Sequence, residues 1–285
     1  MRIDQTVTIG EMSMQVVRRV IYLLTAVAFV FSATVASAQV WNHDPDSAIG
    51  PNHWGKLVFP FATCGAEENS TFVEVGKKQT PVGIVPAETV AAALPELEFQ
   101  YRSTPFVVEN TGHVVEVPYE PGSALRVGKE KYELLQFHFH APSEHTVNGQ
   151  FAAAELHLVH RNTLLDLAVV GVLVNVGSPV NKVIDKILLG APIESGEEVD
   201  LGESVNAKSV LPRHSERYYY NYSGSLTTPP CSEGVRWLVL KEPVFVSQEA
   251  IDRLHEIIAE FDNYDGFPDN NRPVRPLNGR VILKR

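Results

Sequence analysis

Short apolar runs separated by turn residues recur along the chain from residue 39 onward, and this recurrence limits the fold more than any other feature. The runs are rich in β-branched and aromatic residues, which favour strands over helices. Residues 164–176 are apolar on both faces, so we expect the sheet to pass through the middle of the molecule. The predicted strands are 71–75, 98–102, 113–119, 132–140, 154–160, 164–176, 235–244 and 280–285.

Two segments have helical periodicity instead. Ser178 and Pro179 predict the cap and the first turn of one helix, which should end before Gly190, and Ser247 predicts the cap of the other. Their apolar stripes are Val180, Val183, Ile184, Ile187 and Leu188, and Ile251, Leu254, Ile257, Ile258 and Phe261. Many strands and two short peripheral helices, with no repeat or linker, imply one domain built on one large sheet.

The first 38 residues differ in character from the rest of the chain. Arg18 and Arg19 precede the apolar run 20–35 and the small residues 36–38, a pattern typical of a secretory signal peptide cleaved after Ala38. A membrane anchor is the alternative, because the run approaches the length that spans a bilayer. We therefore predict a mature chain of residues 39–285 that is periplasmic or secreted and is not held in a membrane after cleavage.

Charge and cysteine content narrow the partners and the compartment. The formal net charge of −10 argues against nucleic acid or an anionic membrane as a partner, because either would repel the chain. Cys64 and Cys231 are the two cysteines of the sequence. In an exported protein such a pair predicts a disulfide rather than a redox or zinc motif.

The segment 136–140 reads QFHFH, which places imidazoles in what otherwise resembles a buried strand. Side chains alternate along a strand, so His138 and His140 should project from one face and Phe137 and Phe139 from the other. Two imidazoles on one face, about 7 Å apart along the strand, can converge on one ion. Histidines hydrogen-bonded within the core are the alternative.

The segment 154–160, AELHLVH, offers a third imidazole. Glu155 and His157 share one face of this strand, and His160 lies on the opposite face. A carboxylate beside a histidine is the arrangement that orients a ligating imidazole, so we select His157 and not His160. Three imidazoles leave the fourth position of a tetrahedral zinc ion open, which is typical of a catalytic site.

A different metal site also fits part of this sequence. Residues 138–144, HFHAPSE, match the cupin pattern H-x-H-x(3)-E, in which Glu144 would itself be a ligand. That pattern expects glycines where Tyr132 and Phe151 stand, and its second half has no clear match downstream. The cupin interpretation is therefore disfavoured.

Several segments together resemble the signature segments of the α-class carbonic anhydrases of the exported bacterial type. They are QFHFH, SEH, AAELHLVH, GSLTTPPC and WLVLKEPV, with QTPVGI at 79–84 and NNRPVRPL at 270–277. The matches keep the order of the family from about residue 41 to the C-terminus. So many ordered matches make the resemblance highly specific.

The resemblance implies a mostly β (α+β) single domain over residues 39–285, with a central twisted, predominantly antiparallel sheet of about ten strands and short peripheral helices. It implies Zn²⁺ as the cofactor and carbonate dehydratase activity, the reversible hydration of carbon dioxide to bicarbonate and a proton. Sulfonamides and small anions are the expected inhibitors, and a homodimer is left open. A non-catalytic carbonic anhydrase-related binding protein and a zinc-dependent esterase are the alternatives.

The resemblance also assigns roles residue by residue. His138, His140 and His157 match the zinc ligands, in agreement with the choice from strand parity. The hydrogen-bond partners of these ligands match Gln136, Glu155 and the backbone carbonyl of Asn270.

Thr227 and Glu144 match a pair that the family uses to orient hydroxide. A threonine hydroxyl has one proton to donate, and an ionised carboxylate only accepts. If Thr227 donates to Glu144, the lone pairs of its hydroxyl are left to accept a hydrogen bond from the nucleophile.

His113 matches the histidine that carries the proton out of the site. The apolar wall where carbon dioxide rests, with a neighbouring threonine, matches Val159, Val169, Leu226, Thr228, Val235 and Trp237. Without the resemblance, most of these residues would be interpreted as ordinary core.

The chain departs from the family pattern at several positions. His43 falls near the place of a family tyrosine, Thr111 stands where asparagine is frequent, and Glu116 adds a carboxylate at the rim. Asn271 and Arg275 replace a tryptophan and a glutamine of the late motif. The first three changes bear on solvent order and proton transfer, not on the metal ligands.

Overall fold

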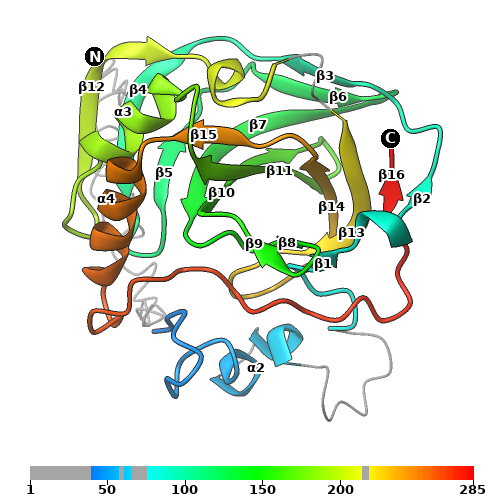
Figure 1. Cartoon of the computed structure of the whole chain (residues 1–285), viewed down its shortest axis with the longest axis horizontal. Helices are drawn as coiled ribbons and strands as arrows, with labels where there is room; N and C mark the ends of the chain where they lie inside the picture. The colour runs from blue at the N-terminus through cyan, green and yellow to red at the C-terminus, as the bar shows by residue number, and fades with distance from the viewer. Residues whose placement is uncertain (1–39, 58–60, 66–75, 214–217) are drawn as a thin grey trace, which may run out of the picture. The chain divides into compact units, whose positions relative to one another are not determined.

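The computed structural model describes residues 40–57, 61–65, 76–213 and 218–285 (Figure 1). The chain divides after Val40 into two compact units, and the second, Trp41–Arg285, contains all of the described elements. The predicted signal peptide and the predicted strand at 71–75 lie outside the described residues.

One large sheet organises this unit, and it contains thirteen strands among the described residues. Its neighbours pair antiparallel except for β11 with β14, β11 with β15 and β16 with β2. Along its main path the ten strands are β12 (Glu198–Val205), β4 (Thr104–Asn110), β5 (Val115–Pro118), β7 (Glu130–His140), β10 (Ala154–Arg161), β11 (Leu167–Val176), β14 (Glu233–Leu240), β13 (Tyr219–Ser225), β16 (Leu283–Lys284) and β2 (Val90–Ala91). The predicted fold class is confirmed.

Shorter strands complete the architecture. β15 (Val244–Val246) pairs with β11, while β3 (Leu97–Gln100) and β6 (Ala124–Val127) extend the sheet beside β7. A separate small sheet contains β1 (Gly83–Ile84), β8 (Thr146–Val147) and β9 (Gln150–Phe151). The 3₁₀ turns are η1 (Phe61–Gly65), η2 (Pro86–Glu88) and η3 (Ala207–Val210).

The helices are α2 (Trp54–Leu57), α3 (Lys182–Gly190) and α4 (Gln248–Ala259), and α3 and α4 pack side by side (Figure 1). The predicted cap of α4 is confirmed, since Ser247 Oγ accepts from the backbone N–H of Ala250. The predicted cap of α3 is wrong. Asn181, not Ser178, caps this helix, because its carboxamide oxygen accepts from the backbone N–H groups of Val183 and Ile184. Within the described ranges, no helix is long and apolar enough to cross a membrane.

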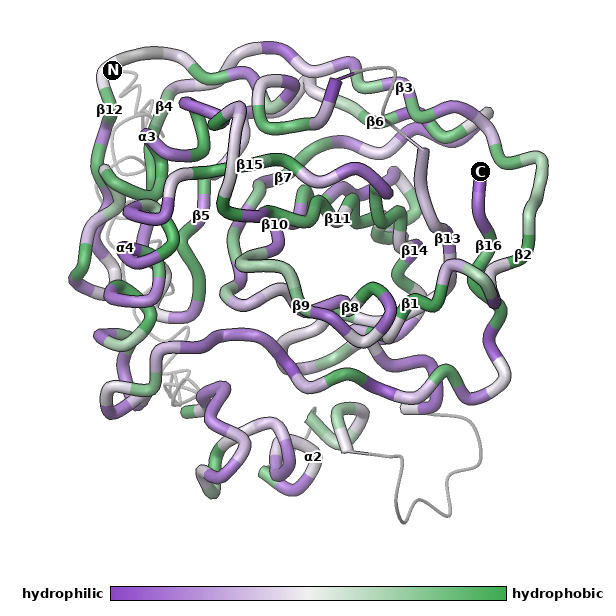
Figure 2. Tube along the Cα trace, in the orientation of Figure 1, coloured by the Kyte–Doolittle hydropathy of each residue, from purple (hydrophilic) through white to green (hydrophobic). Residues whose placement is uncertain are grey.

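The two faces of the sheet pack against different apolar clusters. Strands β10 and β11 carry hydrophobic residues along much of their length (Figure 2). Leu156 and Leu158 belong to the larger cluster, which also contains the buried faces of α3 and α4. Val159, on the other face of β10, packs against a smaller cluster around Trp237. The predicted histidine site lies on this second face.

Candidate metal centre

Three imidazoles meet where β7 and β10 pair. The antiparallel register sets His157 opposite His138 and Glu155 opposite His140. The ring centroids are 5.0 Å apart for His138 and His140, 5.3 Å for His138 and His157, and 4.8 Å for His140 and His157. One ring nitrogen of each lies within 4.8 Å of the others, so the three can hold one metal ion.

Each imidazole is oriented through its second nitrogen. His138 Nδ1 donates to Gln136 Oε1 at 2.8 Å, because the amide oxygen can only accept. His140 Nδ1 donates to the carbonyl of Asn270 at 2.7 Å, and His157 Nε2 bonds Glu155 Oε1 at 3.0 Å. These bonds leave His138 Nε2, His140 Nε2 and His157 Nδ1 toward the centre, which is the arrangement of oriented metal ligands.

Burial and charge set the protonation of these groups. Burial lowers the pKa of His138 and of His140, with the neighbouring imidazoles adding to the effect at His138. Burial also acts to lower the pKa of His157, but the carboxylates of Glu155 and Glu144 outweigh it and raise that pKa. Glu155 shows the reverse, since His145 and His157 overcome its burial and hold its pKa well below the usual value.

Glu155 is the central member of a hydrogen-bond network, of which the sequence predicted only the bond to His157. Its Oε1 also bonds His145 Nδ1 at 2.7 Å, and its Oε2 accepts from the backbone N–H groups of Glu144 and His145. His145 Nε2 in turn lies 2.7 Å from the hydroxyl of Tyr222. The sequence patterns assign no role to His145 or Tyr222, although His145 is the histidine of the SEH segment.

Glu144 lies directly beside the centre. Its Oε1 accepts from the backbone N–H of Arg272 at 2.9 Å. Its Oε2 is 3.8 Å from both His140 Nε2 and His157 Nδ1, and it has no hydrogen-bond partner among the described residues. No hydrogen bond joins buried Thr227 to Glu144 in this structure. That this bond forms in the active enzyme therefore stays a prediction.

Trp237, one residue of the predicted apolar wall, lies beside the centre. The ring of Trp237 lies 4.9 Å from that of His157 and 5.0 Å from that of His145, between centroids. The rest of the predicted wall packs together with it in the smaller cluster: Val159, Val169, Leu226 and Val235. Thr228 is half-buried in the adjoining turn, where its carbonyl accepts from the backbone N–H of Cys231.

The ring of His113 is stacked on a tryptophan. Its ring is 3.8 Å from that of Trp41, at an interplanar angle of 9°. Burial lowers its pKa to about 4, against a smaller opposing effect of Asp262. Asn270 connects this histidine to the metal site, because its amide donates to the carbonyl of His113 while its own carbonyl accepts from His140.

The positions that depart from the family pattern have distinct surroundings. His43 is buried, and its Nδ1 is hydrogen-bonded to the hydroxyl of Tyr264. The hydroxyl of Thr111 donates to the carbonyl of Val114. Burial, together with Glu109, raises the pKa of Glu116 to about 7.

The predicted disulfide between Cys64 and Cys231 is confirmed. It packs with Trp41, Trp54 and Phe61 in a third apolar cluster. The bridge thus attaches the Thr227 loop covalently to the N-terminal part of this unit.

Buried Arg272 fixes the same region from inside. One guanidinium nitrogen donates to Gln79 Oε1 and the carbonyl of Thr80, and the other donates to the carbonyl of Cys64. Its backbone N–H holds Glu144. Arg272 therefore ties Glu144 to the segment that carries the bridge.

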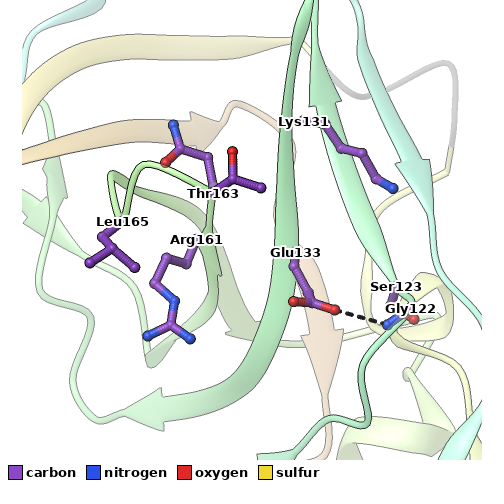
Figure 3. Close-up of a pocket in the computed structure, with 8 residues that line it drawn as sticks. Gly122, Ser123, Lys131, Glu133, Arg161, Thr163 and Leu165 are labelled. Carbon is purple, nitrogen blue, oxygen red and sulfur yellow. Dashed lines mark hydrogen bonds between the residues drawn. The ribbon is translucent and has the colours of Figure 1, made fainter.

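A surface pocket of about 350 Å³ lies elsewhere on the same strands (Figure 3). Lys131 and Glu133 of β7 and Arg161 of β10 line it, and Glu133 Oε1 accepts from the backbone N–H of Gly122. None of the predicted site residues lines this pocket. The three-histidine centre is therefore the candidate functional site.

Three imidazoles that can hold one metal ion, with no thiolate in the group, are the donor set typical of enzymes with an open catalytic metal site rather than of structural metal sites. The family model of eukaryotic-type carbonic anhydrases matches residues 49–285, and the chain belongs to this family. The predicted enzyme class, carbonate dehydratase, is confirmed by this membership.

Individual relatives agree with the family model. A carbonic anhydrase of Nostoc is 36% identical over 261 residues, which cover 89% of this chain and 91% of that protein. A carbonic anhydrase of Neisseria gonorrhoeae is 36% identical, with 92% and 96% covered. The solved α-carbonic anhydrase of Thermovibrio ammonificans, in complex with sulfanilamide, has a TM-score of 0.76 and 38% identity, with 86% of this chain and 99% of that chain covered.

Proposed function

We propose that this protein is a zinc carbonic anhydrase that interconverts carbon dioxide and bicarbonate. The observation that carries the proposal is the convergence of three ring nitrogens, each on an imidazole oriented by an acceptor at its other nitrogen. A protonated imidazole cannot bind a metal, and burial, which lowers the pKa of His138 and His140, favours their neutral form. At His157, whose pKa the neighbouring carboxylates raise, zinc has to compete with a proton. The residues present therefore fit zinc.

Zinc, when bound, supplies activation of water at neutral pH and a positive charge for the developing anion. The chain supplies orientation and exclusion of water. Glu155, Gln136 and the carbonyl of Asn270 hold the three ligand rings. The apolar wall around Trp237 can hold carbon dioxide, which is linear and nonpolar, without competing for it through hydrogen bonds.

Thr227 and Glu144 are the proposed orienting pair. Glu144 Oε2 is buried with a free acceptor position, and a buried carboxylate oxygen without a partner is costly. Donation from the Thr227 hydroxyl would satisfy this oxygen. The threonine oxygen would then accept from the nucleophile and fix the direction of its attack.

His113 is the proposed proton acceptor. Stacked on Trp41, with a pKa of about 4, its ring is a weak base at neutral pH. Rotation of the ring away from Trp41 into water would remove the desolvation that lowers its pKa. We infer that proton transfer requires this rotation, and that hydration by His113→Ala is slow in dilute buffer and restored by added imidazole.

The proposal includes export and the family's inhibitors. Residues 1–38 are the proposed signal peptide and residues 39–285 the catalytic domain, periplasmic or secreted. The disulfide supports this, because such bonds persist in oxidising compartments. The sulfanilamide complex of the Thermovibrio relative supports sulfonamide binding.

The test is to measure zinc content, carbon dioxide hydration and ester hydrolysis on purified residues 39–285, before and after removal of zinc by a chelator. We expect about one zinc per chain, hydration that is lost with the metal and restored by it, and inhibition by sulfanilamide. Zinc without hydration would favour a binding protein. Ester hydrolysis without hydration would favour an esterase, and either result would overturn the proposal.

A further inference from the structure

A second group of metal-binding side chains overlaps the three-histidine centre. It consists of His43, His140 and Glu144, all buried, with one ligand atom of each within 4.8 Å of the others. His140 belongs to both groups. His43 comes from the N-terminal segment before α2, near the place of a tyrosine in the family pattern, so this chain adds a fourth imidazole beside the site.

Two atoms of this group are buried and have no hydrogen-bond partner among the described residues, namely His43 Nε2 and Glu144 Oε2. Each belongs to a side chain whose other polar atom is occupied. His43 Nδ1 bonds the hydroxyl of Tyr264, and Glu144 Oε1 accepts from the backbone N–H of Arg272. An imidazole or carboxylate held through one atom, with the other left free, is oriented as a metal ligand is.

The ring of His43 is also fixed by packing. It meets Trp41 and Trp54 edge to face, with centroids 5.2 Å and 5.4 Å away, and lies 6.2 Å from the ring of His140. A buried polar atom without a partner carries a free-energy cost, which a bound cation would remove. The free nitrogen of His43 therefore requires an explanation.

A third group of the same residue types provides the contrast. His145, Glu155 and His157 also lie within reach of one another. Here both carboxylate oxygens of Glu155 and both nitrogens of His145 are engaged in hydrogen bonds within the protein. The hydrogen bonds of this group therefore leave no position for an ion. In the His43 group, by contrast, His43 Nε2 and Glu144 Oε2 have no hydrogen-bond partner among the described residues.

We propose that His43, His140 and Glu144 form a second position for a divalent cation beside the three-histidine centre. Two histidines and one glutamate are a donor set that zinc uses in other enzymes, and imidazole also suits cobalt, nickel and copper. His140 Nε2 has one lone pair, so the two positions exclude each other and the chain binds one ion in total. Glu144 Oε2 accepts from Thr227 when the ion is in the three-histidine centre, as the proposed function has it, and binds the ion only in the second position. The inference rests on the metal binding of the proposed function.

The test removes a ligand that only the first centre uses. His138→Ala leaves the second position intact, and His43→Ala/His138→Ala removes a ligand from both. Zinc affinity is measured by competition with a chromophoric chelator, and the cobalt-loaded proteins are compared by their visible spectra. Circular dichroism of each metal-free variant establishes that it is folded.

We expect His138→Ala to bind one zinc per chain with reduced affinity. Removal of His43 from that variant should weaken zinc binding by at least about tenfold, since even a residue that only orients a ligand contributes that much. The same removal should weaken binding far less in a chain that retains His138. The cobalt spectrum of His138→Ala should also change when His43 is removed.

The matched control is His138→Ala/His255→Ala, which removes an imidazole on α4 that bonds the carbonyl of Pro268. Its zinc affinity should equal that of His138→Ala. Equal affinity and identical cobalt spectra for His138→Ala with and without His43 would overturn the second position and leave the proposed function standing. Failure of the wild-type chain to bind zinc would overturn both.

Discussion

His157 and His160 lie three residues apart on β10, and both are buried, yet they have opposite surroundings. His157 faces two other imidazoles, and the carboxylates of Glu155 and Glu144 outweigh its burial and raise its pKa. On the other face, His160 bonds the hydroxyl of Tyr101 and the carbonyl of Ala168, and burial lowers its pKa to about 4. The side chains that surround a buried histidine, rather than its burial, therefore decide whether it is available for chemistry.

The largest expected effect is on the metal. His157→Ala should weaken zinc binding by more than about 100-fold, because it removes a ligand and not only a partner that orients one. His160→Ala should retain zinc, because that side chain lies on the face away from the centre. Zinc affinity of the two purified variants is the measurement, and equal losses would remove the distinction between the faces.

The free energy of unfolding should depend more on the core face of β10 than on the face that carries His157. Leu158→Ala opens a cavity in the larger cluster and should cost about 3 kcal/mol of unfolding free energy while zinc is retained. The neighbouring Val159→Ala, on the metal face and only partly buried, should cost less stability but lower the hydration rate. Denaturant unfolding and hydration assays on both variants test this, and a larger stability loss at Val159 would contradict it.

Within the metal face, ligand and orienting residues should separate. Thr227→Ala should keep zinc near one per chain while hydration falls about 10²-fold, the loss typical of one preorganised hydrogen bond. Thr227→Ser keeps the hydroxyl and should retain most of the activity. Loss of zinc from Thr227→Ala would show that the residue supports the metal itself.

The smallest effect is a pH dependence on the core face. The pKa of His160 is about 4 in the folded chain, below the ordinary histidine value of 6.5, so the unfolded chain binds its proton first as the pH falls. The contribution of this group to the unfolding free energy is therefore fully present above pH 6.5 and is lost toward pH 4. About 2 kcal/mol of unfolding free energy is lost between pH 7 and pH 5. Because glutamine does not titrate, the His160→Gln variant should lose about 2 kcal/mol less unfolding free energy between pH 7 and pH 5 than the unsubstituted chain. Unfolding curves at the two pH values measure it, and identical pH slopes would contradict it.

Strand parity predicted the central part of the site because it depends only on local geometry. Alternation of side chains separated His157 from His160 without knowledge of the neighbouring strands. The position of Asn270 came from the family resemblance, since nothing local to that residue marks its carbonyl. The network through His145 and Tyr222 was missed, because residues 77 positions apart meet only after β13 and the β8 segment are in place.

Two other features illustrate what sequence patterns cannot decide. Ser178 with Pro179 is as good a helix start as Asn181, and the choice depends on which side chain reaches the free N–H groups. His43 was recognised as a departure from the family, but its approach to His140 and Glu144 depends on the folded N-terminal segment. Local patterns therefore predicted faces and elements, whereas contacts between distant segments required the structure.

The bridge between Cys64 and Cys231 also determines how the molecule carries mechanical load. It joins positions 167 residues apart, and both strands of the three-histidine centre lie inside the loop it closes. When the two chain ends are pulled apart, tension passes through the sulfur–sulfur bond and bypasses that loop. At about 3.4 Å per extended residue, roughly 570 Å of contour is withheld from extension until the bond is reduced. A stretched but oxidised molecule would thus keep the three histidines of the centre outside the loaded segment.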